Sequence, residues 1–300
     1  VSTTDDDVAG FTITETEGST TVTEAGSTDT FDVVLNAQPD SNVVLTISSS
    51  DTGESTVHGS TPSNNTITFT SANWDTPQAF TVTGVDDDLV DGTVSSTVTV
   101  SVVDAVSDNN FDGVADQTVT ASTTDDDVAG FTIAETEGST GVTEAGGTDT
   151  FTIVLNAQPD SDVVLSIISS DTGEATVTSS LTFTSANWDT AQTVTVTGAD
   201  DDLIDGTISS TITISINDAA SDNNFDGVAD QTVTASTTDD DVAGFTIAET
   251  EGSTGVTEAG GTDTFTIVLN AQPDSDVVLS IISSDTGEAT VTSSLTFTSA

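Results

Sequence analysis

The feature that most constrains the fold of this chain is its internal repetition. The segment VAGFTI begins at Val8, Val128 and Val242, and residues 128–186 recur without a single change as residues 242–300. Recurrence at long, regular spacing is typical of tandem arrays in which one structural unit follows another. The sequence predicts the end of a preceding repeat at 1–7, a first repeat at 8–127, a second at 128–241 and a partial third at 242–300.

The third copy stops within a predicted strand. Half of a sandwich cannot bury its inner face, so we do not expect 242–300 to fold alone. We interpret the chain as a segment of a longer protein whose targeting signals lie elsewhere. Within the segment, no apolar run approaches the roughly 18 residues of a membrane-spanning helix.

Within the second repeat, apolar and polar residues alternate with a period of two, the pattern of half-buried β-strands. Short strands separated by Gly, Asn, Asp and Pro are typical of immunoglobulin-like sandwiches. The predicted fold class is therefore all-β: tandem immunoglobulin-like antiparallel β-sandwiches of about seven strands each, arranged end to end. Trp74 and Trp188 recur at one repeat position, which favours a core or edge plug over a ligand-stacking role. The predicted inward-facing residues, strand by strand, are Phe131 and Ile133; Phe151, Ile153 and Leu155; Val163, Leu165 and Ile167; Leu181 and Phe183; Val194 and Val196; Ile208, Ile212, Ile214 and Ile216; and Val233.

Charge excludes several classes of partner. The chain contains 51 Asp plus Glu and no Lys or Arg. Affinity for nucleic acid comes from basic residues that release phosphate counterions, and anionic membranes attract basic segments, so neither partner is expected. Cysteine is also absent, which excludes disulfides. Bound cations are the remaining means of stabilising such a domain outside the cell.

One short motif resembles the first part of an EF-hand calcium loop. Residues 222–230 place side-chain oxygens at loop positions 1, 3, 5 and 9, with Gly227 at position 6 and a backbone carbonyl at position 7. Position 12 is Val233 instead of a bidentate Glu, so an upstream Asp is expected to complete the site. An acidic Asx turn is the alternative interpretation. The predicted ligands are Asp218, Asp222, Asn224, Asp226, Val228 and Asp230, and in the first repeat Asp104, Asp108, Asn110, Asp112, Val114 and Asp116.

A second acidic set is spread along the repeat: Glu144, the run at 200–205 and the run at 239–241. In a seven-stranded sandwich, alternate loops and the end of the last strand lie at one pole, so we expect these carboxylates to converge. A solvated turn is the alternative for any single run. So many like charges at one pole repel strongly unless a divalent ion is bound.

The segments VTEAG, DDDLIDG and the terminal DDD resemble the pattern of Calx-β domains, in which calcium is held between loops at one pole. The segment LTFTSANWDTAQTVTVTGADDD also resembles repeats of very large bacterial surface adhesins. This chain has Asp205-Gly206 where Calx-β domains commonly have Glu-Gly. The calcium ligands that the resemblance implies are Glu144, Asp200, Asp201, Asp202, Asp205, Asp239, Asp240 and Asp241, and in the first repeat Glu24, Asp86, Asp87, Asp88, Asp91, Asp125, Asp126 and Asp127.

These features predict a structural protein and not an enzyme. The single histidine, His58, lies in an insertion of the first repeat, so no His-based triad can belong to the repeat. A carboxylate pair acting on a glycoside is the catalytic alternative. We expect calcium-stiffened extender repeats of a secreted or cell-surface bacterial adhesin or filament, with Ca²⁺ and neighbouring repeats as partners. The alternative is an extracellular filament, matrix or surface-layer protein whose identical chains associate with one another.

Overall fold

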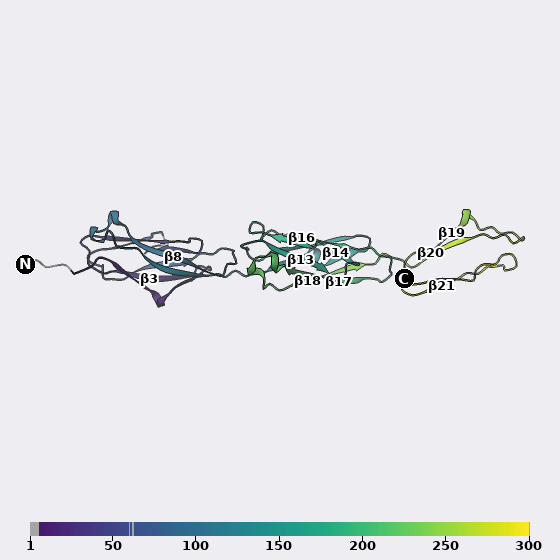
Figure 1. Ribbon diagram of the computed structural model, residues 1–300, viewed down its shortest axis with the longest axis horizontal. Helices are drawn as coiled ribbons and strands as arrows, with labels where there is room; N and C mark the ends of the chain where they lie inside the picture. The colour runs from purple at the N-terminus through teal and green to yellow at the C-terminus, as the bar shows by residue number, and fades with distance from the viewer. Residues whose placement is uncertain (1–5, 60, 62, 300) are drawn as a thin grey trace, which may run out of the picture. The chain divides into compact units, whose positions relative to one another are not determined.

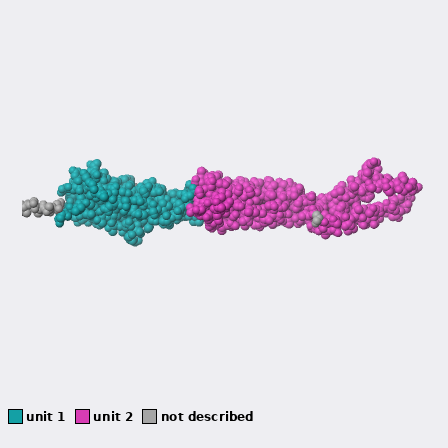
Figure 2. All heavy atoms as spheres, in the orientation of Figure 1, with its two compact units in different colours: residues 1–129, 157–160 teal, residues 130–156, 161–300 magenta. Residues whose placement is uncertain are grey.

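The computed structural model describes residues 6–59, 61 and 63–299 and divides the chain into two compact units. Unit 1 extends to residue 129 and includes 157–160, whereas unit 2 takes 130–156 and the residues from 161 onward (Figure 2). Regular structure in the described residues consists of β-strands and short 3₁₀ helices. In that part of the chain, no helix has the length and apolar character needed to span a membrane.

Unit 1 is a sandwich of two sheets (Figure 1). One sheet is antiparallel, in the order β1 (Phe11–Glu15), β3 (Thr28–Leu35), β7 (Gln78–Gly84) and β5 (Ser55–His58). The other has the order β2 (Thr20–Thr23), β9 (Gln117–Thr124), β8 (Thr93–Val102), β4 (Val43–Ser49) and β6 (Thr66–Phe69). Its β2 and β9 run parallel, and its other neighbouring strands run antiparallel.

Unit 2 contains the same sandwich. Its four-stranded sheet has the order β10 (Phe131–Glu135), β12 (Thr148–Leu155), β16 (Gln192–Gly198) and β14 (Ala175–Val177). Its five-stranded sheet has the order β11 (Thr140–Thr143), β18 (Gln231–Thr238), β17 (Ile208–Ile216), β13 (Val163–Ser169) and β15 (Ser180–Phe183), with β11 parallel to β18. The predicted all-β sandwich class is confirmed.

Two features raise the strand number above the predicted seven. After β10, a 3₁₀ turn in which Glu137 has a left-handed φ of 56° leads into β11, a strand that was not predicted and that joins the other sheet. The short strand β14 adds an edge to the four-stranded sheet. The 3₁₀ helices are η1 (Thr16–Gly18), η2 (Asp104–Val106), η3 (Asn109–Phe111), η4 (Thr136–Gly138), η5 (Asp218–Ala220), η6 (Asn223–Phe225) and η7 (Thr250–Gly252).

The core lies between the sheets and follows the predicted alternation. In unit 1, the rings of Phe31 and Phe80 pack with centroids 5.7 Å apart. In unit 2, Phe151 and Ile214 are fully buried from opposite sheets. Burial of each such side chain contributes about 1.5–3 kcal/mol. Trp74 is half-buried against the core of unit 1, as expected for a plug.

The third copy forms two hairpin-like pairs: β19 (Phe245–Glu249) with β20 (Phe265–Leu269), and β21 (Val277–Ser280) with β22 (Ser294–Phe297). Phe245 is 50% exposed, whereas its counterpart Phe131 is 3% exposed. The local sequence is the same, so the difference arises from the strands that cover the core. No residues of this chain correspond to β16, β17 and β18 for the third copy.

Candidate metal centre

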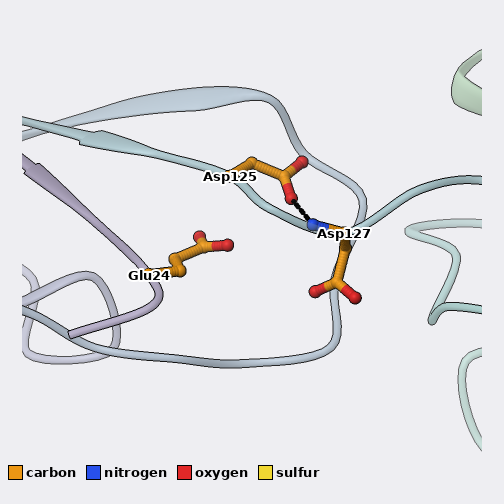
Figure 3. Close-up of side chains that lie close together, drawn as sticks. All are labelled: Glu24, Asp125 and Asp127. Carbon is orange, nitrogen blue, oxygen red and sulfur yellow. Dashed lines mark hydrogen bonds between the residues drawn. The ribbon is translucent and has the colours of Figure 1, made fainter.

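Acidic side chains from four separate segments meet at one pole of each complete sandwich. In unit 1 these are the β2–β3, β4–β5 and β7–β8 loops and the chain that follows β9. Oxygens of Glu24, Asp125 and Asp127 lie within 4.8 Å of one another, with the Glu24 carboxylate directed toward the other two (Figure 3). Glu24 also forms such a group with Glu54 and Asp91. The two groups share one carboxylate, so the pole is a single acidic centre.

Unit 2 repeats this arrangement around Glu144. One group combines Glu144 with Asp201 and Asp241, and the other combines it with Glu174 and Asp205. In both units, the central Glu follows the strand that runs parallel to the last strand of the sandwich. The Glu144 N–H continues that pairing by donating to the Thr238 carbonyl at 3.1 Å.

Glycine contacts fix the position of this glutamate. An added Cβ at Gly198 would lie 2.0 Å from the Thr143 carbonyl oxygen, so only glycine allows β16 to approach the residue before Glu144 this closely. Gly84 and Thr23 make the same approach in unit 1. Gly146 then turns the chain away with a φ of 80°.

The loop at 85–92 is ordered by carboxylates of the centre. Asp125 accepts from the N–H groups of Gly92 and Asp91 at 2.7 and 3.1 Å, and from that of Asp127 at 2.7 Å. Asp87 accepts from the Leu89 N–H at 2.8 Å. These bonds hold the acidic loop in place and leave other carboxylate oxygens facing one another.

The central carboxylates are buried with oxygens that lack a hydrogen-bond donor. Glu24 and Glu144 are each 1% exposed, and Glu54 and Glu174 are each 6% exposed. Burial of an unpaired carboxylate is costly because the charged form loses its hydration. The chain has no Lys or Arg to compensate the charge. Among the described residues, the buried carboxylate oxygens with no partner are Glu24 Oε1, Glu54 Oε2, Asp91 Oδ1, Glu144 Oε1 and Oε2, and Glu174 Oε2.

The electrostatics of the centre follow from this burial. Loss of hydration, reinforced by the nearby charges of Asp125, Asp87 and Glu54, raises the pKa of Glu24 from 4.5 to about 7, although the Asp126 N–H acts in the opposite direction. Burial first, and neighbouring carboxylates second, also raise the pKa of the other members of the centre. These are Glu54, Asp91, Asp127, Glu144, Glu174 and Asp241.

The donor set matches a hard divalent cation. All of the grouped atoms are carboxylate oxygens, which suit calcium, magnesium and manganese better than softer metals. Calcium takes six to eight oxygens at about 2.3–2.6 Å and tolerates irregular geometry. In unit 1, Glu24, Glu54 and Asp91 bring unpartnered oxygens from three segments, and their grouped oxygens lie within 4.8 Å of one another, close enough to share one ion.

Glu54 and Glu174 were not among the predicted ligands. They lie in the β4–β5 and β13–β14 loops, which belong to the pole where convergence was predicted. The segment DTGE ends at Glu54, Glu174 and Glu288, so recurrence was the signal that could have found them.

Several predicted ligands lie at the pole but outside the four groups. Their side chains are exposed, or their oxygens accept hydrogen bonds from backbone N–H groups. Among the described residues, those outside the groups are Asp86, Asp87, Asp88, Asp126, Asp200, Asp202, Asp239 and Asp240.

The first Asp of the EF-hand-like loop forms an Asx turn, the alternative interpretation of this sequence. Asp222 is 5% exposed; its carboxylate accepts from the N–H groups of Asn224 and Ser161, both at 2.9 Å. Asp108 accepts in the same way in unit 1, and these backbone bonds lower its pKa. Each Asp therefore caps a 3₁₀ turn and ties two loops together at the opposite pole.

The other carboxylates of these loops are dispersed. Asp112, Asp116, Asp226 and Asp230 are exposed and belong to none of the groups formed within the described residues. Asp104 and Asp218 begin the 3₁₀ helices η2 and η5 and are likewise exposed. Calcium binding by Asn110, Val114, Asn224 and Val228 of these loops stays a prediction.

The class of protein is thus an all-β chain of repeated sandwiches, each with a buried carboxylate centre at one pole. No protein-family model and no curated protein matches the chain. The chain is similar to the solved calcium-binding domain CBD12 of CALX1.1, with 16% identity, a TM-score of 0.27 and coverage of 68% of this chain and 80% of that one. It is also similar to domains 4 and 5 of the S-layer protein SbsC, with 16% identity, a TM-score of 0.31 and coverage of 77% and 99%. At values this low, the fold class rests on the strand pairing of the chain itself.

Proposed function

We propose that each complete repeat binds calcium at its carboxylate centre and that the repeats act as a calcium-stiffened extender of an extracellular adhesin or surface filament. The observation that carries this proposal is the set of buried, unpartnered oxygens of Glu24, Glu54, Glu144 and Glu174 in a chain without basic side chains. We expect more than one ion in each complete repeat, because its two groups share only the central Glu.

The stabilising effect of calcium follows from linkage. An ion that binds only the folded state stabilises it by RT ln(1 + [L]/Kd), about 2.7 kcal/mol at a hundredfold excess over Kd. Thermal unfolding in calcium, in magnesium and in chelator tests the proposal. We expect the highest melting temperature in calcium, a smaller gain in magnesium, and the lowest value in chelator. A melting curve that does not respond to calcium contradicts calcium binding.

Stiffening follows from where the ligands lie in the sequence. Asp125 and Asp127 directly precede the start of the second repeat, and Asp241 directly precedes the third. Ions at these carboxylates restrain the segment that leads into the next repeat. We expect small-angle scattering to give a narrower distribution of interatomic distances in calcium than in chelator.

The extender is favoured over lateral self-association by charge. Identical chains with a net charge of −51 repel one another, and none supplies a basic partner. Sedimentation at millimolar calcium distinguishes the two functions. A monomer supports the extender, whereas calcium-dependent oligomers support a filament or surface layer.

A further inference from the structure

The acidic loop of the second repeat contacts a loop of the third copy within unit 2. Leu203 forms a parallel β-bridge with Gln272. The Gln272 N–H donates to the Asp202 carbonyl at 2.6 Å. Ile204 also lines a pocket of about 250 Å³ with Phe245 and other apolar residues of the third copy. The loop that carries candidate metal ligands thus also contacts the copy that follows it.

The same contact occurs inside unit 1, which includes residues 157–160. Leu89 forms a parallel bridge with Gln158, whose N–H donates to the Asp88 carbonyl at 2.6 Å. The Val90 N–H donates to the Gln158 carbonyl at 3.1 Å. These bonds involve only backbone atoms, and the bridge and the bond from the Gln N–H recur at corresponding positions of the repeat.

A third copy of the receiving loop provides an internal comparison. The segment NAQPD contains Gln38, Gln158 and Gln272. No segment of this chain that corresponds to 85–92 precedes Gln38. Gln38 is exposed and Gln158 is half-buried; Gln272, which makes the bridge in the incomplete third copy, is exposed as well. Among the described residues, the feature that Gln158 and Gln272 share and Gln38 lacks is therefore the backbone bridge, and not side-chain burial.

The contact is joined directly to the carboxylate centre. Asp201 belongs to the centre of unit 2 and accepts from the Leu203 N–H at 2.7 Å, which fixes the turn that presents Leu203 to Gln272. In unit 1, Asp87 holds Leu89 in the same way. Asp160 follows Gln158 by two residues, and its charge is one of those that raise the pKa of Asp91. Metal ligands and the bridging residue therefore share one short loop.

We propose that the loops 85–92 and 199–206 are docking surfaces for the NAQPD loop of the following repeat, and that ion binding in the centre strengthens this docking. The occupant is a second repeat of the same chain, held by backbone bonds to the Gln of NAQPD. A cation in the centre neutralises the carboxylates that flank the bridging residue and reduces their repulsion of Asp160. The coupling to calcium rests on the proposed function; the docking itself does not.

Amide hydrogen exchange of the 300-residue chain tests the docking, read by NMR at the three Gln residues of NAQPD. The Gln158 and Gln272 amides should exchange at least tenfold more slowly than the Gln38 amide. Calcium should slow the exchange of Gln158 further and leave Gln38 unchanged. Equal exchange at all three positions, with calcium and with chelator, overturns the docking.

Proline substitution tests the coupling, because it removes the N–H donor of the bridge. The coupling between calcium binding and docking is reciprocal. If calcium strengthens the contact, loss of the contact must weaken calcium binding by the same factor. We expect Gln158→Pro to reduce the calcium affinity of the first repeat about fivefold or more. The matched control is Gln38→Pro, which places the same residue in the same loop sequence without a described docking partner.

The outcomes separate the two proposals. Slow exchange at Gln158 together with an absence of calcium binding supports docking and contradicts the proposed function. Calcium binding with equal affinity in Gln158→Pro and Gln38→Pro overturns the coupling. Reduced affinity in Gln158→Pro alone supports it.

Discussion

Single residues of the carboxylate centre carry an energetic conflict that a cation removes. Glu144 is 1% exposed, and neither of its carboxylate oxygens has a hydrogen-bond partner. Without an ion, its charged form is opposed by desolvation and by Asp201, Asp239 and Glu174, although the Asp240 N–H acts in the opposite direction and the net effect is a raised pKa. The same burial that destabilises the ion-free protein pre-positions the oxygens for an ion.

Neutralising Glu144 should have different effects on the stability of the ion-free protein and of the calcium-bound protein. Glu144→Gln removes a ligand charge but retains the shape of the side chain. In calcium, we expect the variant to lose about 2 kcal/mol of stability relative to wild type, because the linkage term is reduced. In chelator at pH 8, we expect no loss, because the unpaired charge is gone. The exposed Glu137→Gln is the matched control, and thermal or urea unfolding gives the free energies.

The raised pKa of Glu24 predicts an inverted pH dependence without calcium. Its pKa is about 7 in the folded protein against an ordinary value of 4.5, so between these values the folded state binds more protons than the unfolded state. This contribution to stability is present below pH 4.5 and is lost as the pH rises through about 7. In chelator, the melting temperature should be higher at pH 5.5 than at pH 8, and Glu24→Gln should reduce that difference.

Calcium should reverse this pH dependence of stability, because calcium binds the deprotonated carboxylate. Calcium affinity, measured by titration calorimetry, should therefore increase from pH 5.5 to pH 8. The pKa of Asp108 is lowered from the ordinary value of 3.8 by its backbone hydrogen bonds. The stability that Asp108 contributes is therefore lost only at a pH below this value, outside the range from pH 5.5 to pH 8. A calcium affinity that is independent of pH would contradict a role for Glu24 as a ligand.

At the scale of elements, close packing between strands positions the centre. An added Cβ at Gly198 would lie 2.0 Å from the Thr143 carbonyl oxygen. Gly198→Ala should therefore cost about 1–3 kcal/mol and weaken calcium binding, because β16 must move away from the residue before Glu144. Gly141→Ala is the matched control, since nothing lies within 4 Å of an added Cβ there. Equal stability of the two variants would show that the close contact between Gly198 and Thr143 does not fix the position of Glu144.

The loop at 222–230 allows a test of its own. Asp222→Ala should destabilise the second repeat by about 1 kcal/mol in calcium and in chelator alike, because it removes a capping carboxylate. Asp226 is exposed and, within the described residues, belongs to no carboxylate group. If the loop also binds calcium as the sequence predicts, Asp226→Ala should lower the number of ions bound per repeat. An unchanged number assigns the loop a structural role only.

The elements also show how far sequence reasoning reaches. Alternation correctly predicts the buried Phe151, Ile153 and Ile214, because a period-two pattern directly encodes which face a strand buries. It misses β11, because that short strand is defined by its parallel pairing with β18, a contact distant in sequence. Recurrence and topology together predict the acidic pole, but Glu174 lies outside the acidic runs and the segments of the Calx-β resemblance, so only the recurrence of DTGE could have indicated it. The capping by Asp222 was hidden because the same Asx spacing suits a turn and a calcium loop.

At the scale of the whole molecule, the absence of basic residues leaves the 51 carboxylate side chains without cationic side chains as partners. Net charge of this size destabilises compact states through self-repulsion. Monovalent salt screens exposed charges, with a Debye length of about 8 Å at physiological ionic strength, but it acts less on the buried centre. Divalent binding at the centre, as proposed, would therefore stabilise the fold in a way that monovalent screening of exposed charges does not.

The most direct test of this account is a crystal structure of the protein grown in millimolar calcium, with calcium located by anomalous scattering. We predict anomalous peaks at the pole of each complete repeat, about 2.3–2.6 Å from the carboxylate oxygens of Glu24 and Glu54, and of Glu144 and Glu174. The absence of a peak at these carboxylates, in crystals that contain calcium, would contradict the central claim.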